Sequence, residues 1–207
     1  NFTSSPSCGI GYFEYAGTNF DFSAGMILRN GNVNLTSGPY LENISNLSSE
    51  CSLSGDIQLQ NISDANGGTQ VINDVTFVQF DFIPLTDTFS FNYIFASNEY
   101  GEFQCEFSDV FAFILTDLTT NTSTNLAVIP NSTTPVSVTT IRNAIHNFAG
   151  ETCSSANPLL FDTYNVGNTS SVMNMRGFAV PMTASATVIP NRVYRIKLAI
   201  GDYRDSS

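Results

Sequence analysis

The stretch Val75–Ala96, which reads VTFVQFDFIPLTDTFSFNYIFA, contains two aromatic-rich runs separated by a turn. In the second run, Thr88–Ala96, aromatic residues recur at every second position, which is typical of a β-strand with one buried face. The residues on that face are Phe89, Phe91, Tyr93 and Phe95. Pro84 and the Thr-Asp pair that follows it predict the turn. The stretch therefore predicts two strands, Val75–Phe82 and Thr88–Ala96, that share an aromatic core.

Strand patterns also dominate the rest of the chain. Asp109–Leu115 reads DVFAFIL, a continuous apolar run that is typical of a strand buried on both faces. Further strands are predicted at Thr124–Ile129, Pro135–Ile141, Gly177–Met182 and Val193–Ile200. A helical period is nearly absent and occurs only weakly in Ile141–Phe148. This pattern predicts one domain over residues 1–207, an all-β, two-sheet antiparallel β-sandwich, jelly-roll-like, with long polar loops.

The composition narrows the class of protein. Of the 207 residues, 42% are apolar and 17 are Phe, which is enough for a sizeable core. Only 12% are charged, so Asn, Ser and Thr must supply most of the polar surface, as in secreted adhesive proteins. A net charge of −11 with seven basic residues disfavours nucleic acid, which requires Lys and Arg to neutralise its phosphates. No apolar run is long enough to span a bilayer, so we expect no direct membrane insertion.

The cysteines indicate an oxidising environment. They are Cys8, Cys51, Cys105 and Cys153, and no two form the close pair that zinc sites usually show. An even number in an Asn- and Thr-rich chain suggests two disulfides. Three pairings are possible, and the spacing alone does not choose among them. Our prediction is the pairing of nearest neighbours, Cys8–Cys51 and Cys105–Cys153.

Acidic side chains gather in two segments. Ser97–Asp109, which reads SNEYGEFQCEFSD, lies between two predicted strands, and Gly201–Ser207, which reads GDYRDSS, follows the last one. Carboxylates held close together repel one another unless a cation compensates, and Ca²⁺ takes six to eight oxygen ligands. If the two segments meet at one end of the sandwich, they predict a calcium site. Its ligands would be Glu99, Asp109, Asp202 and Asp205. The alternative is a solvated acidic loop in which Arg204 pairs with a carboxylate.

Sequence motifs for catalysis are few. His146 is the single histidine, and no G-x-S-x-G motif accompanies it. A glycosidase would use two carboxylates of Ser97–Asp109, but the chain has no Trp to form a sugar platform. The sequence contains neither a P-loop nor a G-x-G-x-x-G motif. We therefore expect that the chain is not an enzyme.

One long segment resembles a known family. Phe80–Leu115, which reads FDFIPLTDTFSFNYIFASNEYGEFQCEFSDVFAFIL, is similar to the signature of the choice-of-anchor L domain family. That signature has an FDF strand, an aromatic strand that ends in FASEEY, and a strand of the form NDVFAF. Here Asn98 replaces the first Glu of EEY, and Ser108 stands in place of the Asn. Looser similarities lie at Cys8–Gly31, Gly55–Leu59, Gly177–Met182 and Val193–Asp202.

The resemblance implies a β-sandwich on secreted surface proteins of Bacteroidota and their relatives. Such proteins are commonly exported by the type IX secretion system and carry varied C-terminal anchors, and gliding-motility adhesins are candidate members. The resemblance implies no catalytic activity and no assigned ligand set. Since the chain starts without Met and stops just after a strand-like run, we expect it to be part of a larger extracellular, cell-surface chain.

Three functions remain open. The leading hypothesis is a non-catalytic extracellular adhesion or recognition module, stabilised by Ca²⁺, of a large secreted cell-surface protein. Its partner would be a polysaccharide or a cell-surface or envelope protein. The alternative is a structural or assembly domain that docks to the secretion or gliding machinery. A polysaccharide hydrolase is the least favoured hypothesis.

Overall fold

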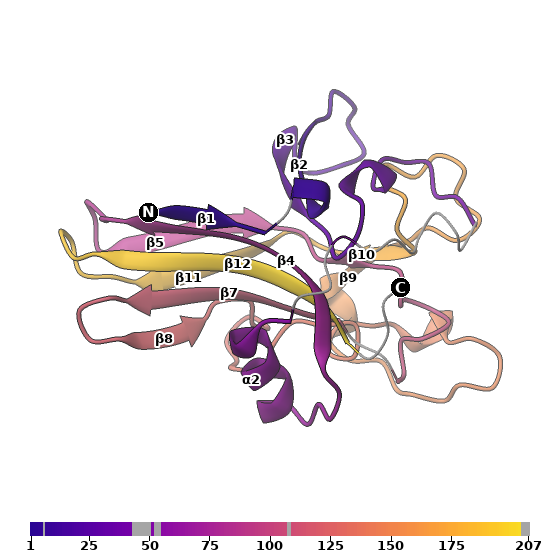
Figure 1. Ribbon diagram of the computed structural model, residues 1–207. Coiled ribbons are helices and arrows are strands. Elements are labelled where there is room, and N and C mark those ends of the chain that lie inside the picture. Colours follow the sequence, from indigo (N-terminus) through magenta and orange to yellow (C-terminus); the bar gives the residue numbers. More distant parts are fainter. Residues whose placement is uncertain (6, 43–50, 52–54, 107–108, 204–207) are drawn as a thin grey trace.

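The computed structural model describes residues 1–5, 7–42, 51, 55–106 and 109–203. These residues form an antiparallel β-sandwich, which confirms the predicted fold class (Figure 1). The larger layer is a five-stranded sheet in the order β1-β4-β12-β7-β8. Its strands are β1 (Phe2–Ser4), β4 (Ile72–Phe82), β12 (Tyr194–Tyr203), β7 (Val110–Asp117) and β8 (Thr122–Asn125).

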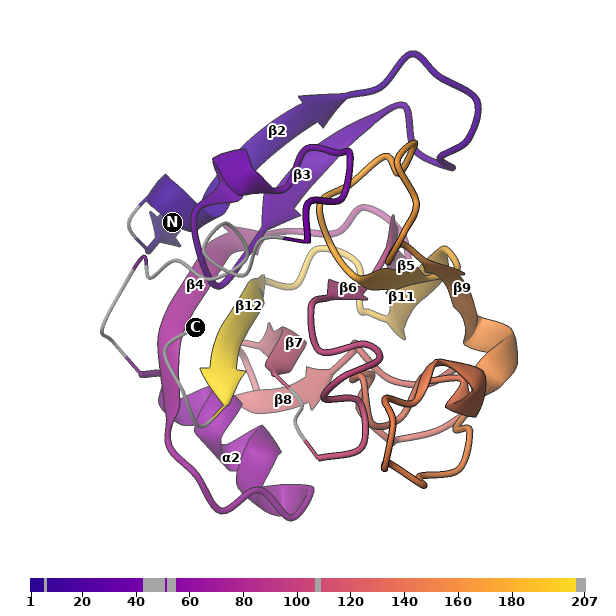
Figure 2. The same cartoon turned by 90° about the vertical axis from the view of Figure 1, so that its right-hand side faces the viewer.

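The facing layer consists of smaller sheets. β5 pairs with β11, and β10 lies between β6 and β9. Because β6 follows β5 and β11 follows β10 along the chain, these two sheets continue one another. Their strands are β5 (Thr88–Tyr93), β6 (Ala96–Ser97), β9 (Phe161–Tyr164), β10 (Gly177–Ala179) and β11 (Met182–Thr187). A separate hairpin of β2 (Ile10–Glu14) and β3 (Ala24–Leu28) stands apart from both layers in Figure 2.

The core between the layers is aromatic, as the alternation in Thr88–Ala96 predicts. Phe91 of β5 packs edge-to-face on Phe113 of β7, with ring centroids 5.0 Å apart. Phe95 stacks on Phe111 at the same 5.0 Å separation. Such ring pairs contribute beyond the area that they bury. The predicted core face of this strand is therefore confirmed.

The second face of β7 is also buried, as its continuous apolar run predicts. There the sheet is covered by α2 (Ile57–Ala65), a nine-residue helix that the sequence analysis did not predict. Leu59 is fully buried and packs with Ala112 and Ala199. The helix was missed because its apolar stripe is short and its residues are mostly polar. Its one clear signal is the N-cap Asp56, whose Oδ1 accepts hydrogen bonds from the two backbone amides at positions 58 and 59.

Other boundaries differ from the predictions. The predicted strand Pro135–Ile141 is wrong: within it only Pro135 forms an isolated bridge, with Val128. The weakly helical Ile141–Phe148 contains just a short 3₁₀ helix. The strands that were missed are short, exposed or built from small residues, so their alternation is faint; they are β1, β2, β9 and β11. The similarity of Cys8–Gly31 to the family's opening placed a strand at Gly25–Gly31, where β3 lies. The 3₁₀ helices are η1 (Ser7–Gly9), η2 (Val33–Leu35), η3 (Ala144–His146) and η4 (Pro158–Leu160).

Two disulfides confirm the predicted pairing. Cys8 joins Cys51, with 5.7 Å between the two Cα atoms, and links the start of β2 to the segment before α2. Cys105 joins Cys153, with 5.5 Å between the Cα atoms, and links the acidic loop after β6 to the segment after η3. Each disulfide therefore joins two connecting segments that lie outside the strands.

Candidate functional site

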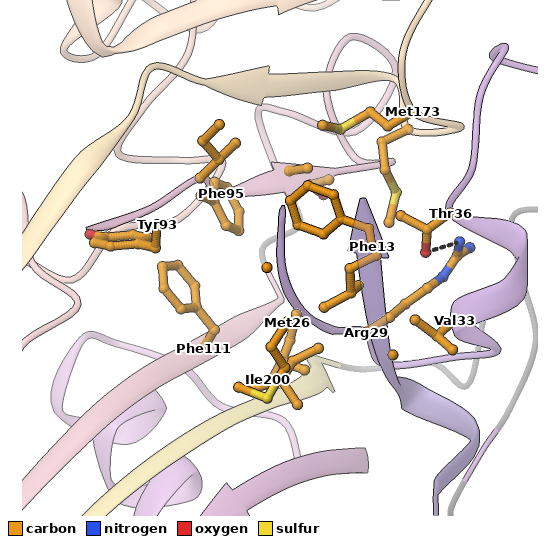
Figure 3. Close-up of a pocket in the computed structure, with 18 of the residues that line it drawn as sticks. Phe13, Met26, Arg29, Val33, Thr36, Tyr93, Phe95, Phe111, Met173 and Ile200 are labelled. Atoms are coloured by element: carbon orange, nitrogen blue, oxygen red, sulfur yellow. Dashed lines mark hydrogen bonds between the residues drawn. The ribbon is translucent and has the colours of Figure 1, made fainter. Parts of the chain in front are cut away.

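A cleft of about 1300 Å³ opens between the β2–β3 hairpin and the strand formed by β5 and β6. Figure 3 shows Tyr93 and Phe95 along one side of it and Phe13 and Arg29 on the other. The hairpin forms its own wall because it pairs with no strand of either layer among the described residues.

The floor of the cleft is the inner face of the five-stranded sheet. Phe111 and Phe113 of β7 lie there beside Leu198 and Ile200 of β12. On β12, Ile196 is covered by the facing layer, whereas Leu198 and Ile200 are only partly buried. The floor is therefore apolar and accessible where the second layer of the sandwich ends.

One end of the cleft is polar. Arg29, at the end of β3, is 3% exposed, and its guanidinium donates to Thr36 Oγ1 at 3.4 Å. Burial lowers the pKa of Arg29. Its neighbour Asn30 donates from Nδ2 to Asp109 Oδ2 at 2.9 Å. A cation and a carboxylate thus line the same end of the cleft.

The acidic residues of the two segments meet at this end. Glu99 Oε2 accepts a hydrogen bond from the Asp109 backbone N–H at 3.0 Å. Asp109 Oδ1 accepts another from the Tyr203 backbone N–H at 3.3 Å. Two carboxylates therefore join the loop after β6 to the last described residues of β12.

A β-bulge determines where β12 ends. The register between β12 and β4 shifts between Ile200 and Asp202, where β4 contains one extra residue. Asp74, in that extra stretch, adopts φ 45°. A Cβ at Gly201 would lie 2.6 Å from Ile72 Cγ2, so the close approach of the two strands requires glycine there. The bulge leaves Asp202 buried and in the lining of the cleft.

Three of the four predicted calcium ligands border the same cleft. Glu99, Asp109 and Asp202 all line the polar end of the cleft, and Asp205 lies outside the described residues. Within the described ranges, however, no three acidic, His or Cys side chains are grouped as a metal site. Oxygens of Glu99 and Asp109 accept protein hydrogen bonds instead. The calcium site therefore stays a hypothesis.

The remaining chemically notable residues have packing or pairing roles. His146 stacks on Tyr164 with ring centroids 4.3 Å apart, and burial lowers the pKa of this imidazole. Glu102 accepts a hydrogen bond from Arg176 Nη2 at 2.6 Å, as an ion pair. These contacts give the single histidine a packing role and one carboxylate of the acidic loop an ion-pair role.

Sequence reasoning missed the hairpin wall. Phe13 and Met26 lie in short strands, and Arg29 directly follows β3. The apolar residues of these strands do not alternate clearly, because several neighbouring positions are glycine or half-exposed. The one signal for this region was the similarity of Cys8–Gly31 to the opening of a known family. That similarity predicted a strand but no cleft.

Comparison with known proteins agrees with this similarity. No curated protein and no solved structure matches the chain. The family model described as "Choice-of-anchor L domain" matches residues 1–207. The two disulfides suit a secreted or surface protein. Among the described helices, none is long and apolar enough to cross a membrane. The chain therefore belongs to the choice-of-anchor L family, and this membership suggests a surface-associated, non-enzymatic module.

Proposed function

We propose that this domain is a non-catalytic extracellular recognition and adhesion module of a larger cell-surface protein, and that its partner binds in the cleft between the β2–β3 hairpin and the β5–β6 strand. The observation that carries the proposal is the cleft itself. An accessible apolar floor with polar groups at one end is the usual form of a binding site. Contiguous apolar surface that is open to solvent usually marks a binding site on a soluble protein.

The lining favours a protein partner over a polysaccharide. Sugar platforms need flat aromatic faces open to solvent, whereas Phe111 and Phe113 on the floor are buried and present only part of their rings. The exposed rings of the lining, Tyr12 and Phe103, come from two different elements, the hairpin and the loop after β6. Exposed apolar side chains such as Met26, which is 47% exposed, stand at the wall of the cleft. Such side chains suit the apolar centre of a protein interface. Of the two partner classes that the sequence indicates, a cell-surface or envelope protein is the one we propose.

The proposal is tested with two matched variants. Met26→Glu places a carboxylate at the cleft wall, and Ile145→Glu places one on η3, where Ile145 is 78% exposed and outside the cleft. Both proteins are tested beside wild type against a panel of purified surface proteins and neutral and acidic polysaccharides. We expect wild type and Ile145→Glu to bind a surface protein, and Met26→Glu to lose about tenfold or more in affinity.

Binding of no panel member by wild type would remove the proposed function. Equal binding by both variants would move the site away from the cleft. If the bound protein belongs to the secretion or gliding machinery, the domain serves assembly instead of adhesion. Calcium is a separate part of the proposal, and it rests on Glu99, Asp109 and Asp202 all lining this cleft.

A further inference from the structure

We propose that the cleft accepts an extended peptide strand of a partner protein, which adds to the free edge of β5. This inference rests on the proposed function, because it names the class of partner for the same cleft. Strand addition uses backbone hydrogen bonds for affinity and alternate side-chain pockets for specificity. Three features of the cleft support it: the edge of β5, the accessible floor and the charge of the chain.

The first feature is an unpaired strand edge. Among the described strands, β5 pairs only with β11. In an antiparallel pair, hydrogen-bonded and non-hydrogen-bonded residue pairs alternate. The Val188 N–H donates to the Asp87 carbonyl at 2.8 Å, so these two residues form a hydrogen-bonded pair. By the alternation, the pairs that Phe89 and Phe91 form with β11 are also hydrogen-bonded, and those of Ser90 and Asn92 are not. Phe91 therefore bonds to β11, whereas Ser90 and Asn92 direct their backbone N–H and C=O groups to the opposite edge.

That edge faces the cleft. Residues 91–97 all line it without interruption, although their side chains alternate between the two faces of the strand. The β11 residues, which pair with the other edge of β5, are absent from that lining, so the cleft lies on the unpaired side of β5. Natural sheets usually protect exposed edges with Lys, Pro or a bulge. The run TFSFNY of β5, Thr88–Tyr93, has none of these.

The second feature is the floor below that edge. A strand beside β5 would point alternate side chains down onto Phe111, Leu198 and Ile200 and the others toward solvent. The cleft volume of about 1300 Å³ exceeds the roughly 300–1,000 Å³ usual for small-molecule sites. The occupant is therefore a chain segment in which every second residue is apolar.

The third feature is charge. The domain carries a net charge of −11, and Glu14 stands in the lining at the hairpin side. Electrostatic complementarity favours Lys or Arg at the solvent-facing positions of the incoming strand. A lipid chain or a neutral sugar would match neither this charge nor the backbone groups of the β5 edge.

The test uses a positional library of terminally blocked nonapeptides in which apolar residues alternate with Thr and Lys. Binding to the whole domain is measured by fluorescence anisotropy up to millimolar protein. The best binder is then compared with a copy N-methylated at the residues that would face β5. N-methylation removes the donors that strand addition needs, so we expect affinity to fall about tenfold or more.

Two proline variants provide a matched pair. Asn92→Pro removes an N–H from the cleft edge of β5, and Ser185→Pro removes one from the outer edge of β11, in the same two-stranded sheet. Neither N–H bonds across the β5–β11 pair, so both variants should keep that pairing. We expect Asn92→Pro to lose peptide binding about tenfold or more and Ser185→Pro to retain it.

The outcomes separate this inference from the proposed function. Equal binding of the N-methylated peptide, or unchanged binding by Asn92→Pro, overturns strand addition. So does the absence of any binder in the library, even where the domain binds a surface protein in the panel above. If Asn92→Pro does not fold, strand addition is still tested by comparing the affinities of the N-methylated and unmodified peptides for the wild-type domain. In the wild-type complex, hydrogen exchange should also show new protection at the Ser90 and Asn92 amides.

Discussion

Lys197 of β12 and Asp56, 141 residues apart in the chain, form an ion pair on the outer face of the five-stranded sheet. Both side chains are nearly buried, at 9% and 14% exposure. Lys197 Nζ also donates to Gln58 Oε1 at 3.2 Å and lies 5.2 Å from the centre of the Phe77 ring. Since the other oxygen of Asp56 caps α2, one carboxylate joins helix and sheet.

We expect Asp56→Ala to destabilise the fold strongly. The change removes a helix cap, which is worth about 1 kcal/mol, and leaves the Lys197 ammonium buried without its counter-ion. Breaking a buried pair in this way typically costs about 3–5 kcal/mol. The measurement is the free energy of urea unfolding. Asp64→Ala, at an exposed position of the same helix, is the control and should change that free energy by less than about 0.5 kcal/mol. Equal losses in both variants would contradict the role of the pair.

Tyr100→Phe should leave the domain as stable or more stable. Tyr100 is fully buried, and within the described residues its hydroxyl has no hydrogen-bond partner. Removing an unsatisfied buried hydroxyl can gain up to about 1 kcal/mol. Tyr194→Phe is the contrast, because its hydroxyl accepts from the Ile189 N–H at 3.0 Å, so we expect a loss of about 1 kcal/mol. The measurement is the melting temperature, which should be equal to or above that of wild type for Tyr100→Phe and below it for Tyr194→Phe.

Alkaline pH should unfold the domain partly through Tyr93. Burial raises the pKa of Tyr93 to about 12, whereas the pKa of an exposed tyrosine is about 10. The folded state therefore holds this proton over a range in which the unfolded chain releases it. Stability from this group is complete below about pH 10 and is lost as the pH rises toward about 12. In unfolding titrations across this range, Tyr93→Phe should lose less stability than wild type. Parallel curves for the two proteins would contradict this assignment.

Calcium removal tests the acidic end of the cleft. If Ca²⁺ binds there only in the native state, EDTA lowers the melting temperature and excess Ca²⁺ restores it. Glu99→Gln and Asp109→Asn should each reduce that restoration. Asp162→Asn, at an exposed position of β9, is the control. A melting temperature that does not respond to EDTA removes the calcium hypothesis.

Much of the sandwich could be read from local pattern. The alternation of Phe89, Phe91 and Tyr93 identifies a strand and its buried face, because a period of two places every second side chain on one side. The apolar run at Val110–Leu115 similarly reports burial on both faces. Helix α2 could not be read in this way, because a short polar helix is stabilised mainly by the sheet on which Leu59 packs.

The candidate site depended more heavily on long-range contacts. The sequence places Glu99 and Asp109 in one loop and Asp202 about a hundred residues later. Only strand order brings them together, since β12 pairs with β7 and ends beside the start of that strand. The hairpin wall with Phe13 and Arg29 had no comparable local signal, because its strands pair only with each other.

By itself, the sequence determined an all-β, disulfide-linked surface domain of the choice-of-anchor L family, because composition, alternation and a signature segment are properties of the chain alone. The sequence left three disulfide pairings open, and the structure shows the pairing of nearest neighbours. Tertiary structure alone decided that the facing layer ends at β5 and leaves a cleft before the β2–β3 hairpin. The physical reason is that an edge strand has the same side-chain pattern as a paired one, so only the neighbouring strands show whether its backbone is free.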